Sequence, residues 1–163
     1  DNNYTTVALS RYVTAVASGK KYNYQLMDRI VDASGKTVKK YKADYEDISD
    51  TLTDSQWDAL HSGMRQVVST MDRFQGFDIP VAGKTGTAQQ TGHANHGLFI
   101  GYAPYDDPEI TIAVRIANGY SSHNAATAAR NVISYYYKET SMKDIKEMKA
   151  AGVNGNTRNS VAD

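Results

Sequence analysis

The segment that most restricts the fold is EITIAVRIA, residues 109–117, in which large aliphatic residues occupy every second position. A period of two residues is typical of a β-strand with one buried face and does not fit a helix. The aliphatic positions are Ile110, Ile112, Val114 and Ile116. The run therefore predicts a sheet, and Val81 to Ala88 and Gly97 to Tyr102 are candidates for two more strands.

Helical patterns surround these strands. The clearest predicted helix runs from Asp54 to Met71, where apolar residues recur every three or four positions and Thr53 with Gln56 forms a capping box. Further helices are predicted from about Thr6 to Ala17, from about Asn124 to Tyr137, and from Met142 to Ala150. The sequence thus predicts helices as well as a sheet.

A hairpin is predicted between the first two helices, since β-prone runs flank the turn residues Ala33 to Lys36. The polar stretch at residues 42–50 is expected to be a plain connection. Residues 139–163 are expected to add only a short charged helix and a disordered tail to a domain that ends near residue 138, because residues 153–163 have almost no apolar content.

Composition excludes several classes of protein. A chain of 163 residues suits one domain, and its 18 basic and 18 acidic residues give no reason to expect nucleic acid as a partner. The absence of cysteine excludes disulfides and thiolate metal sites. No run is apolar enough to span a bilayer and no secretory signal opens the chain, so the sequence is interpreted as part of a longer protein, with any membrane anchor outside it.

The stretch VAGKTGTAQQ, residues 81–90, has two interpretations. Its Gly83-Lys84-Thr85 matches the end of a nucleotide-binding P-loop, but that motif needs a glycine where Asp78 stands, and it must open a helix. The residues that follow Thr85 are strand-like. The alternative is therefore preferred, in which an edge strand presents Lys84.

A strand places Lys84 and Gly86 on one face and Thr85 and Thr87 on the other. Two hydroxyls can bind a carboxylate, a backbone N–H can stabilise an oxyanion, and a lysine can favour proton transfer from nearby hydroxyls. Gly86 removes a side chain where an extended peptide would approach the edge. From this triplet alone, an ordinary polar edge strand remains the competing interpretation.

The neighbouring segments decide between them. AGKTGTAQ, residues 82–89, followed by HGLFIGYAPYDDPEITIAVRIANG, residues 96–119, closely resembles the class B penicillin-binding proteins, the transpeptidases that cross-link peptidoglycan. The resemblance extends over about residues 4–138. Leu98 stands where the family commonly has tryptophan and Gly97 where it commonly has alanine.

The resemblance implies an α+β fold shared with serine β-lactamases, an antiparallel sheet of five strands flanked by helices. It also implies that Lys84 polarises the catalytic serine, that Thr85 and Thr87 bind the substrate carboxylate, and that the Thr87 N–H is an oxyanion donor. Gly86 would leave room for the substrate, and His96 would border the cleft. The expected ligands are peptidoglycan stem peptides and β-lactams, with no cofactor and no metal.

The nucleophile is not found in this chain. Ser18 and Lys21 match Ser-x-x-Lys only by letter, since a glycine follows the serine, and Ser122-His123-Asn124 falls after the lysine strand, where it is expected to cap a helix. The Ser-x-x-Lys and Ser-x-Asn motifs are therefore expected in an N-terminal part of the same protein, which is expected to work at the extracytoplasmic face of the membrane, in cell shape or cell division. Alternatives are a β-lactamase or β-lactam sensor, or an inactive peptide-binding module.

Overall fold

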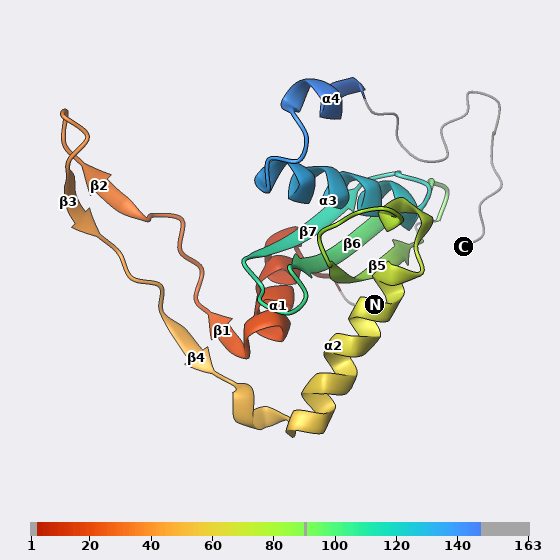
Figure 1. Ribbon diagram of the computed structural model, residues 1–163, viewed down its shortest axis with the longest axis horizontal. Helices are drawn as coiled ribbons and strands as arrows, with labels where there is room; N and C mark the ends of the chain where they lie inside the picture. Colours follow the sequence, from red (N-terminus) through yellow and green to blue (C-terminus); the bar gives the residue numbers. More distant parts are fainter. Residues whose placement is uncertain (1–2, 90, 148–163) are drawn as a thin grey trace.

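The computed structural model of the protein describes residues 3–89 and 91–147. Its centre is an antiparallel sheet of β5 (Ala82–Ala88), β6 (His96–Ala103) and β7 (Ile110–Ile116), in that order. Helices α1 (Thr6–Ser18) and α2 (Asp54–Ser69) pack on one face and α3 (Ser122–Tyr136) packs on the other (Figure 1). The α+β fold and the three strands are confirmed, but the described residues hold only three of the five strands that the resemblance implied.

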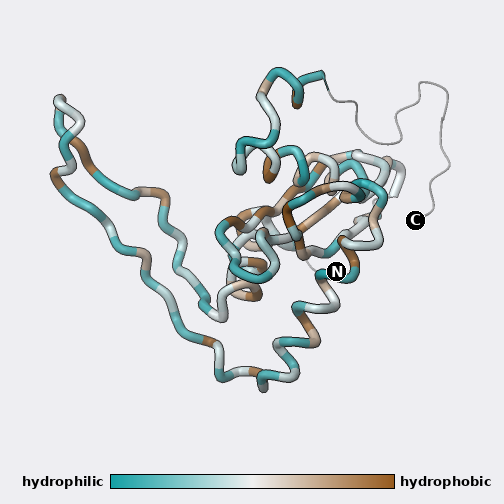
Figure 2. The backbone as a smooth tube through the Cα atoms, in the orientation of Figure 1, coloured by the Kyte–Doolittle hydropathy of each residue, from teal (hydrophilic) through white to brown (hydrophobic). Residues whose placement is uncertain are grey.

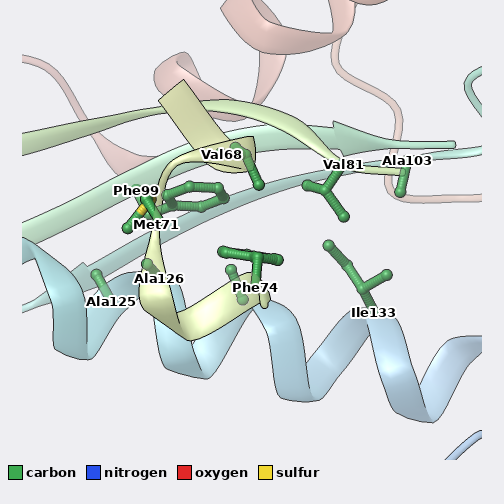
Figure 3. Close-up of a cluster of buried hydrophobic side chains, with 10 residues drawn as sticks. Val68, Met71, Phe74, Val81, Phe99, Ala103, Ala125, Ala126 and Ile133 are labelled. Atoms are coloured by element: carbon green, nitrogen blue, oxygen red, sulfur yellow. The ribbon is translucent and has the colours of Figure 1, made fainter. Parts of the chain in front are cut away.

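The core between the sheet and α3 is built around Phe99, which is fully buried (Figure 3). Phe74, in the 3₁₀ turn η2 (Asp72–Phe74), stacks on Phe99 with ring centroids 5.9 Å apart and an interplanar angle of 25°. Gly83 and Gly101 make room for this ring, because a Cβ built at Gly83 would lie 2.4 Å from Cζ of Phe99 and one at Gly101 2.8 Å from its Cε1. These two glycines therefore serve packing.

The opposite face of the sheet packs against α1 and α2 through Tyr102, of which only 1% is exposed. Val13 and Val16 of α1 and Met64 of α2 belong to the same cluster of buried side chains. His61 Nε2 lies 2.8 Å from the carbonyl oxygen of Val16, so a hydrogen bond joins the two helices.

The helix ends follow local signals. Thr53 and Gln56 form the predicted capping box of α2, and Thr5 caps α1, which ends at Gly19 in a left-handed conformation with φ 65°. The α2 helix ends at Ser69 rather than at Met71, since the backbone of Met71 is extended. The buried side chain of Met71 packs in the core between the sheet and α3.

The region between α1 and α2 is an arm, defined here as residues 20–47, that projects from the rest of the molecule (Figure 1). At its base β1 (Lys20–Tyr22) pairs with β4 (Tyr45–Asp47), and farther out β2 (Arg29–Val31) pairs with β3 (Thr37–Lys40) around the predicted turn. The expectation of a plain connection at residues 42–50 is therefore wrong. Strand β4 has three exposed residues, so no burial imposes the alternation that would have indicated it.

A last helix, α4 (Met142–Glu147), begins after Ser141, whose hydroxyl donates to the Asp144 carboxylate at 2.6 Å. This bond is the main cause that lowers the pKa of Asp144. The prediction of a helix up to Ala150 is confirmed as far as Glu147, and its remainder, like the predicted disordered tail, lies outside the described residues.

Replacing Tyr102 with phenylalanine tests the packing of this core. Burial, with a smaller effect of Tyr105, raises the pKa of Tyr102 to about 12 from its ordinary value near 10. The contribution of Tyr102 to the free energy of unfolding is therefore fully present below pH 10 and is lost as the pH rises through about 12. In this pH range the free energy of unfolding should fall more slowly in the Tyr102→Phe variant than in the wild type, by up to about 1.4 kcal/mol per pH unit.

Urea unfolding between about pH 9 and about pH 11 checks this difference. At neutral pH the variant should unfold at nearly the wild-type urea concentration, because the Tyr102 hydroxyl has no hydrogen-bond partner within the described part of the chain. An equal decrease in the free energy of unfolding of the two proteins as the pH rises would contradict this explanation.

Candidate functional site: the free edge of the lysine strand

Strand β5 lies at an edge of the sheet, because within the described residues it pairs with β6 alone. The beginning of the strand is covered by α2, whose Arg65 Nη1 donates to the carbonyl oxygen of Val81 at 3.0 Å. The other end is open, with Lys84, Thr87 and Ala88 exposed. The described chain thus leaves an accessible strand edge where the sequence predicted the site.

The register of β5 with β6 assigns each site residue to a face. Lys84 pairs with Ile100, which packs on the α1 and α2 side, and Thr85 pairs with Phe99, which packs on the α3 side. Since directly paired residues point to the same face, Lys84 shares a face with Gly86, and Thr85 shares the opposite face with Thr87. The predicted alternation agrees with this register, and only a ligand lying along the edge can meet both sets.

The lysine side chain stays close to its own strand. Lys84 Nζ donates to the carbonyl oxygen of Thr85 at 2.9 Å, and the side chain is exposed. The ammonium group is thereby held beside the edge along which an extended ligand would lie.

Gly86 differs from the neighbouring glycines. A Cβ built at Gly86 would meet only the Leu98 Cβ, at an ordinary 3.6 Å. Packing within the described chain therefore does not require glycine at this position, in contrast to Gly83 and Gly101.

His96 lies opposite Ala88 in the register, on the same face as Lys84. Its Nδ1 accepts a hydrogen bond from the backbone N–H of Asn118 at 2.9 Å. In the neutral ring the proton is then on Nε2. The sequence predicted His96 as a cleft residue, and the structure adds that His96 ties the β7–α3 loop to the end of β6.

This loop, residues 117–121, was not predicted to matter. Asn118 and Tyr120 have positive φ angles of 53° and 64°, and the Tyr120 N–H donates to the Asn95 carbonyl at 3.0 Å. Gly97 allows the contact, because a Cβ there would lie 2.4 Å from the Ser121 carbonyl oxygen. Asparagine often adopts positive φ angles, so Asn118 could have indicated this turn from the sequence. Tyrosine rarely adopts them, so Tyr120 gave no such indication.

The two serines rejected as nucleophiles lie in other environments. Ser18 is the last residue of α1 and donates to the Thr14 carbonyl at 2.7 Å, while Lys21 lies beyond the helix in β1. Ser122 is buried in the first turn of α3, and the cap is Ser121 rather than Ser122. Neither arrangement is the Ser-x-x-Lys helix or the Ser-x-Asn loop of the family.

Metal and membrane sites were also sought. Within the described ranges, no group of three or more His, Cys, Asp or Glu side chains is placed to hold a metal ion. None of the helices described in these ranges combines the length and the hydropathy that crossing a membrane requires.

Comparison with known proteins identifies the family of the chain. The family model for the penicillin-binding protein transpeptidase domain matches residues 2–134. The chain belongs to this family. Its fold also matches the solved structure of penicillin-binding protein 2B from Streptococcus pneumoniae, with a TM-score of 0.72 and 24% identity over 86% of this chain and 26% of that one.

Two curated relatives are peptidoglycan D,D-transpeptidases named MrdA. The Haemophilus influenzae protein is 28% identical over 83% of this chain and 24% of its own length. The Acinetobacter baumannii protein is 36% identical over 52% of this chain and 15% of its own length. The chain thus spans less than a quarter of the length of these two relatives.

A matched pair of alanine variants tests the two kinds of glycine. Gly83→Ala should cost about 1–3 kcal/mol, since the new methyl group collides with the Phe99 ring. Gly86→Ala should change stability by less than about 0.5 kcal/mol, because nothing in the described chain opposes it. Urea unfolding of both variants measures the difference, and equal losses would refute the assignment of Gly86 to the open edge.

Proposed function

We propose that this chain forms one wall of the active site of a penicillin-sensitive peptidoglycan D,D-transpeptidase. One observation carries the proposal. An accessible strand edge presents Lys84, Thr85, Gly86 and Thr87, and its glycine is not required by packing within the described chain. Membership of the transpeptidase family adds the reaction class.

In the proposed complex a stem peptide ending in D-Ala-D-Ala lies along β5 as an added strand. The Thr85 and Thr87 hydroxyls bind its terminal carboxylate. The Thr87 N–H donates to the scissile carbonyl oxygen as negative charge develops there. Gly86 leaves the edge clear, and His96 borders the cleft while it holds the β7–α3 loop.

The chemistry itself needs a serine from another part of the protein. The serine oxygen attacks the carbonyl carbon, its proton passes to the departing amine, and the terminal D-alanine leaves. The amine of a second stem peptide then attacks the ester, forms the cross-link and returns the proton to the serine. The positive charge of Lys84 lowers the cost of removing the serine proton.

The same arrangement explains inhibition by β-lactams, which would acylate the same serine and leave their carboxylate on the two threonines. We infer that Ser-x-x-Lys and Ser-x-Asn lie in an N-terminal part of the protein. Peptidoglycan lies outside the cytoplasm, so we infer that the site works at the extracytoplasmic face of the membrane, with the anchor in that other part.

A first test uses the chain alone. The 163-residue polypeptide should form no covalent adduct with a fluorescent penicillin, because it lacks the nucleophile. Intact-mass spectrometry after prolonged incubation provides the measurement. A stoichiometric acyl adduct would refute the proposal and would point to Ser18 or Ser122.

A second test uses a full-length transpeptidase that contains this chain. Lys84→Ala should slow acylation by penicillin roughly 100-fold, since it removes the charge that assists proton transfer. Thr85→Val with Thr87→Val should mainly weaken binding before acylation. Stopped-flow acylation kinetics separates the two effects, and Lys39→Ala on the arm is the matched control. Unchanged kinetics in the Lys84 variant would exclude its proposed role.

A further inference from the structure

We propose that the arm binds the arm of a second copy of this chain about a two-fold axis. The proposal concerns a surface remote from β5 and does not depend on the proposed reaction. It rests on three observations: the isolation of the arm from the rest of the chain, its exposed apolar side chains, and the opposite charges of its outer part and of the segment that leads from its base into α2.

The arm is poorly supported by its own chain. Within residues 23–47, Tyr41 alone is partly buried, and all others are exposed. An isolated two-stranded ribbon is at best marginally stable in water. Apolar residues nevertheless occur along the arm, as the brown segments of the tube in Figure 2 show, and several of them are exposed. Those on its outer half and its approach are Leu26, Met27, Ile30, Val31 and Val38, with Leu26 fully exposed.

The outer part of the arm and the segment that leads from its base into α2 carry opposite charges. The distal segment, residues 28–42, contains five basic residues and two acidic ones. The proximal segment, residues 44–58, which includes β4, η1 (Ser49–Thr51) and the first turns of α2, contains six acidic residues and no basic one. All six acidic residues are exposed: Asp44, Glu46, Asp47, Asp50, Asp54 and Asp58.

Lys20 and Lys21 of β1 pair in register with Asp47 and Glu46 and offset part of the proximal charge, and the remaining charges have few partners within the described chain. Ion pairs within the described ranges are limited to Lys21 with Glu46 at 2.7 Å and Arg29 with Asp28 at 3.9 Å. The lysines of the distal segment are Lys36, Lys39, Lys40 and Lys42. At about 3.3 Å per residue, Lys36, Lys39 and Lys40 lie roughly 15–30 Å from β4, too far for an ion pair with its acidic residues, whereas Lys42 lies close to them.

A second copy can neutralise both segments at once. In a two-fold arrangement with antiparallel arms, the distal segment of each copy lies beside the proximal segment of the other, and the contact occurs twice. The ribbon also has free backbone groups along its edges, which can pair with another ribbon. Charge complementarity thus selects the antiparallel arrangement, and the exposed apolar side chains supply the area to bury.

Charge reversal provides the test. Variant one is Lys39→Glu with Lys40→Glu, which changes the net charge of the distal segment from +3 to −1. Variant two is Asp50→Lys with Asp54→Lys and Asp58→Lys, which changes the net charge of the proximal segment, counted together with Lys20 and Lys21 of β1, from −4 to +2. Within the described ranges, none of these five side chains makes a hydrogen bond or ion pair. At low salt the wild-type chain should sediment as a dimer. Each variant alone should dimerise about tenfold or more weakly, because like charges meet at both contacts.

The mixture of the two variants is the decisive sample. In the heterodimer one contact keeps its native charges and the other has both charges reversed, so dimerisation should return. Raising the salt to about 1 M should weaken the wild-type dimer, because the screening length falls to about 3 Å. Lys143→Glu with Lys146→Glu in α4 is the matched control and should dimerise like the wild type.

Circular dichroism should show that all variants keep the wild-type helix content. A wild-type chain that remains monomeric at low salt would overturn the proposal. So would a mixture that stays monomeric although each variant is folded, or a control variant that loses the dimer equally.

Discussion

The pairing of β5 with β6 in one register is the interaction on which the rest of this structure depends. It places Thr85 opposite Phe99 and Lys84 opposite Ile100, and these partners pack against helices on opposite faces. A slip of one residue would exchange the faces and bring Lys84 toward the core beside α3. The Phe99 ring opposes the slip, because it occupies the space left by the absent side chain of Gly83 on the neighbouring strand. The register that builds the core is therefore the register that presents the site.

The same pairing explains why a strand edge can be a site at all. The core holds β5 at its beginning through Val81 and Ala82, whereas its later residues have no covering helix among those described. Rigid support on one side and open backbone on the other suit a wall that receives an extended peptide. The hydrogen bond between His96 and Asn118 holds the β7–α3 loop near Ala88, the last residue of β5, so more than one strand pair supports this end of the strand.

Much of this could be predicted from the sequence, and the failures have physical reasons. The strands and the main helices followed from burial periodicity and from caps such as Thr53 with Gln56. Strand β4 was missed because an exposed ribbon imposes no pattern on its side chains. The left-handed Tyr120 was missed because its conformation is set by contacts from Asn95 and Gly97, which are distant in sequence. The absence of the nucleophile stays a prediction, since Ser18 and Ser122 match the motifs by letter and only their places in α1 and α3 argue against them.

The central claim is that this chain holds the substrate carboxylate while another segment supplies the serine. The most direct measurement is a crystal structure of the full-length protein acylated by a β-lactam. The account predicts the carboxylate of the bound antibiotic within about 3 Å of the Thr85 and Thr87 hydroxyls, with its carbonyl oxygen at the Thr87 N–H. An ester on Ser18 or Ser122, or an antibiotic bound away from β5, would contradict it.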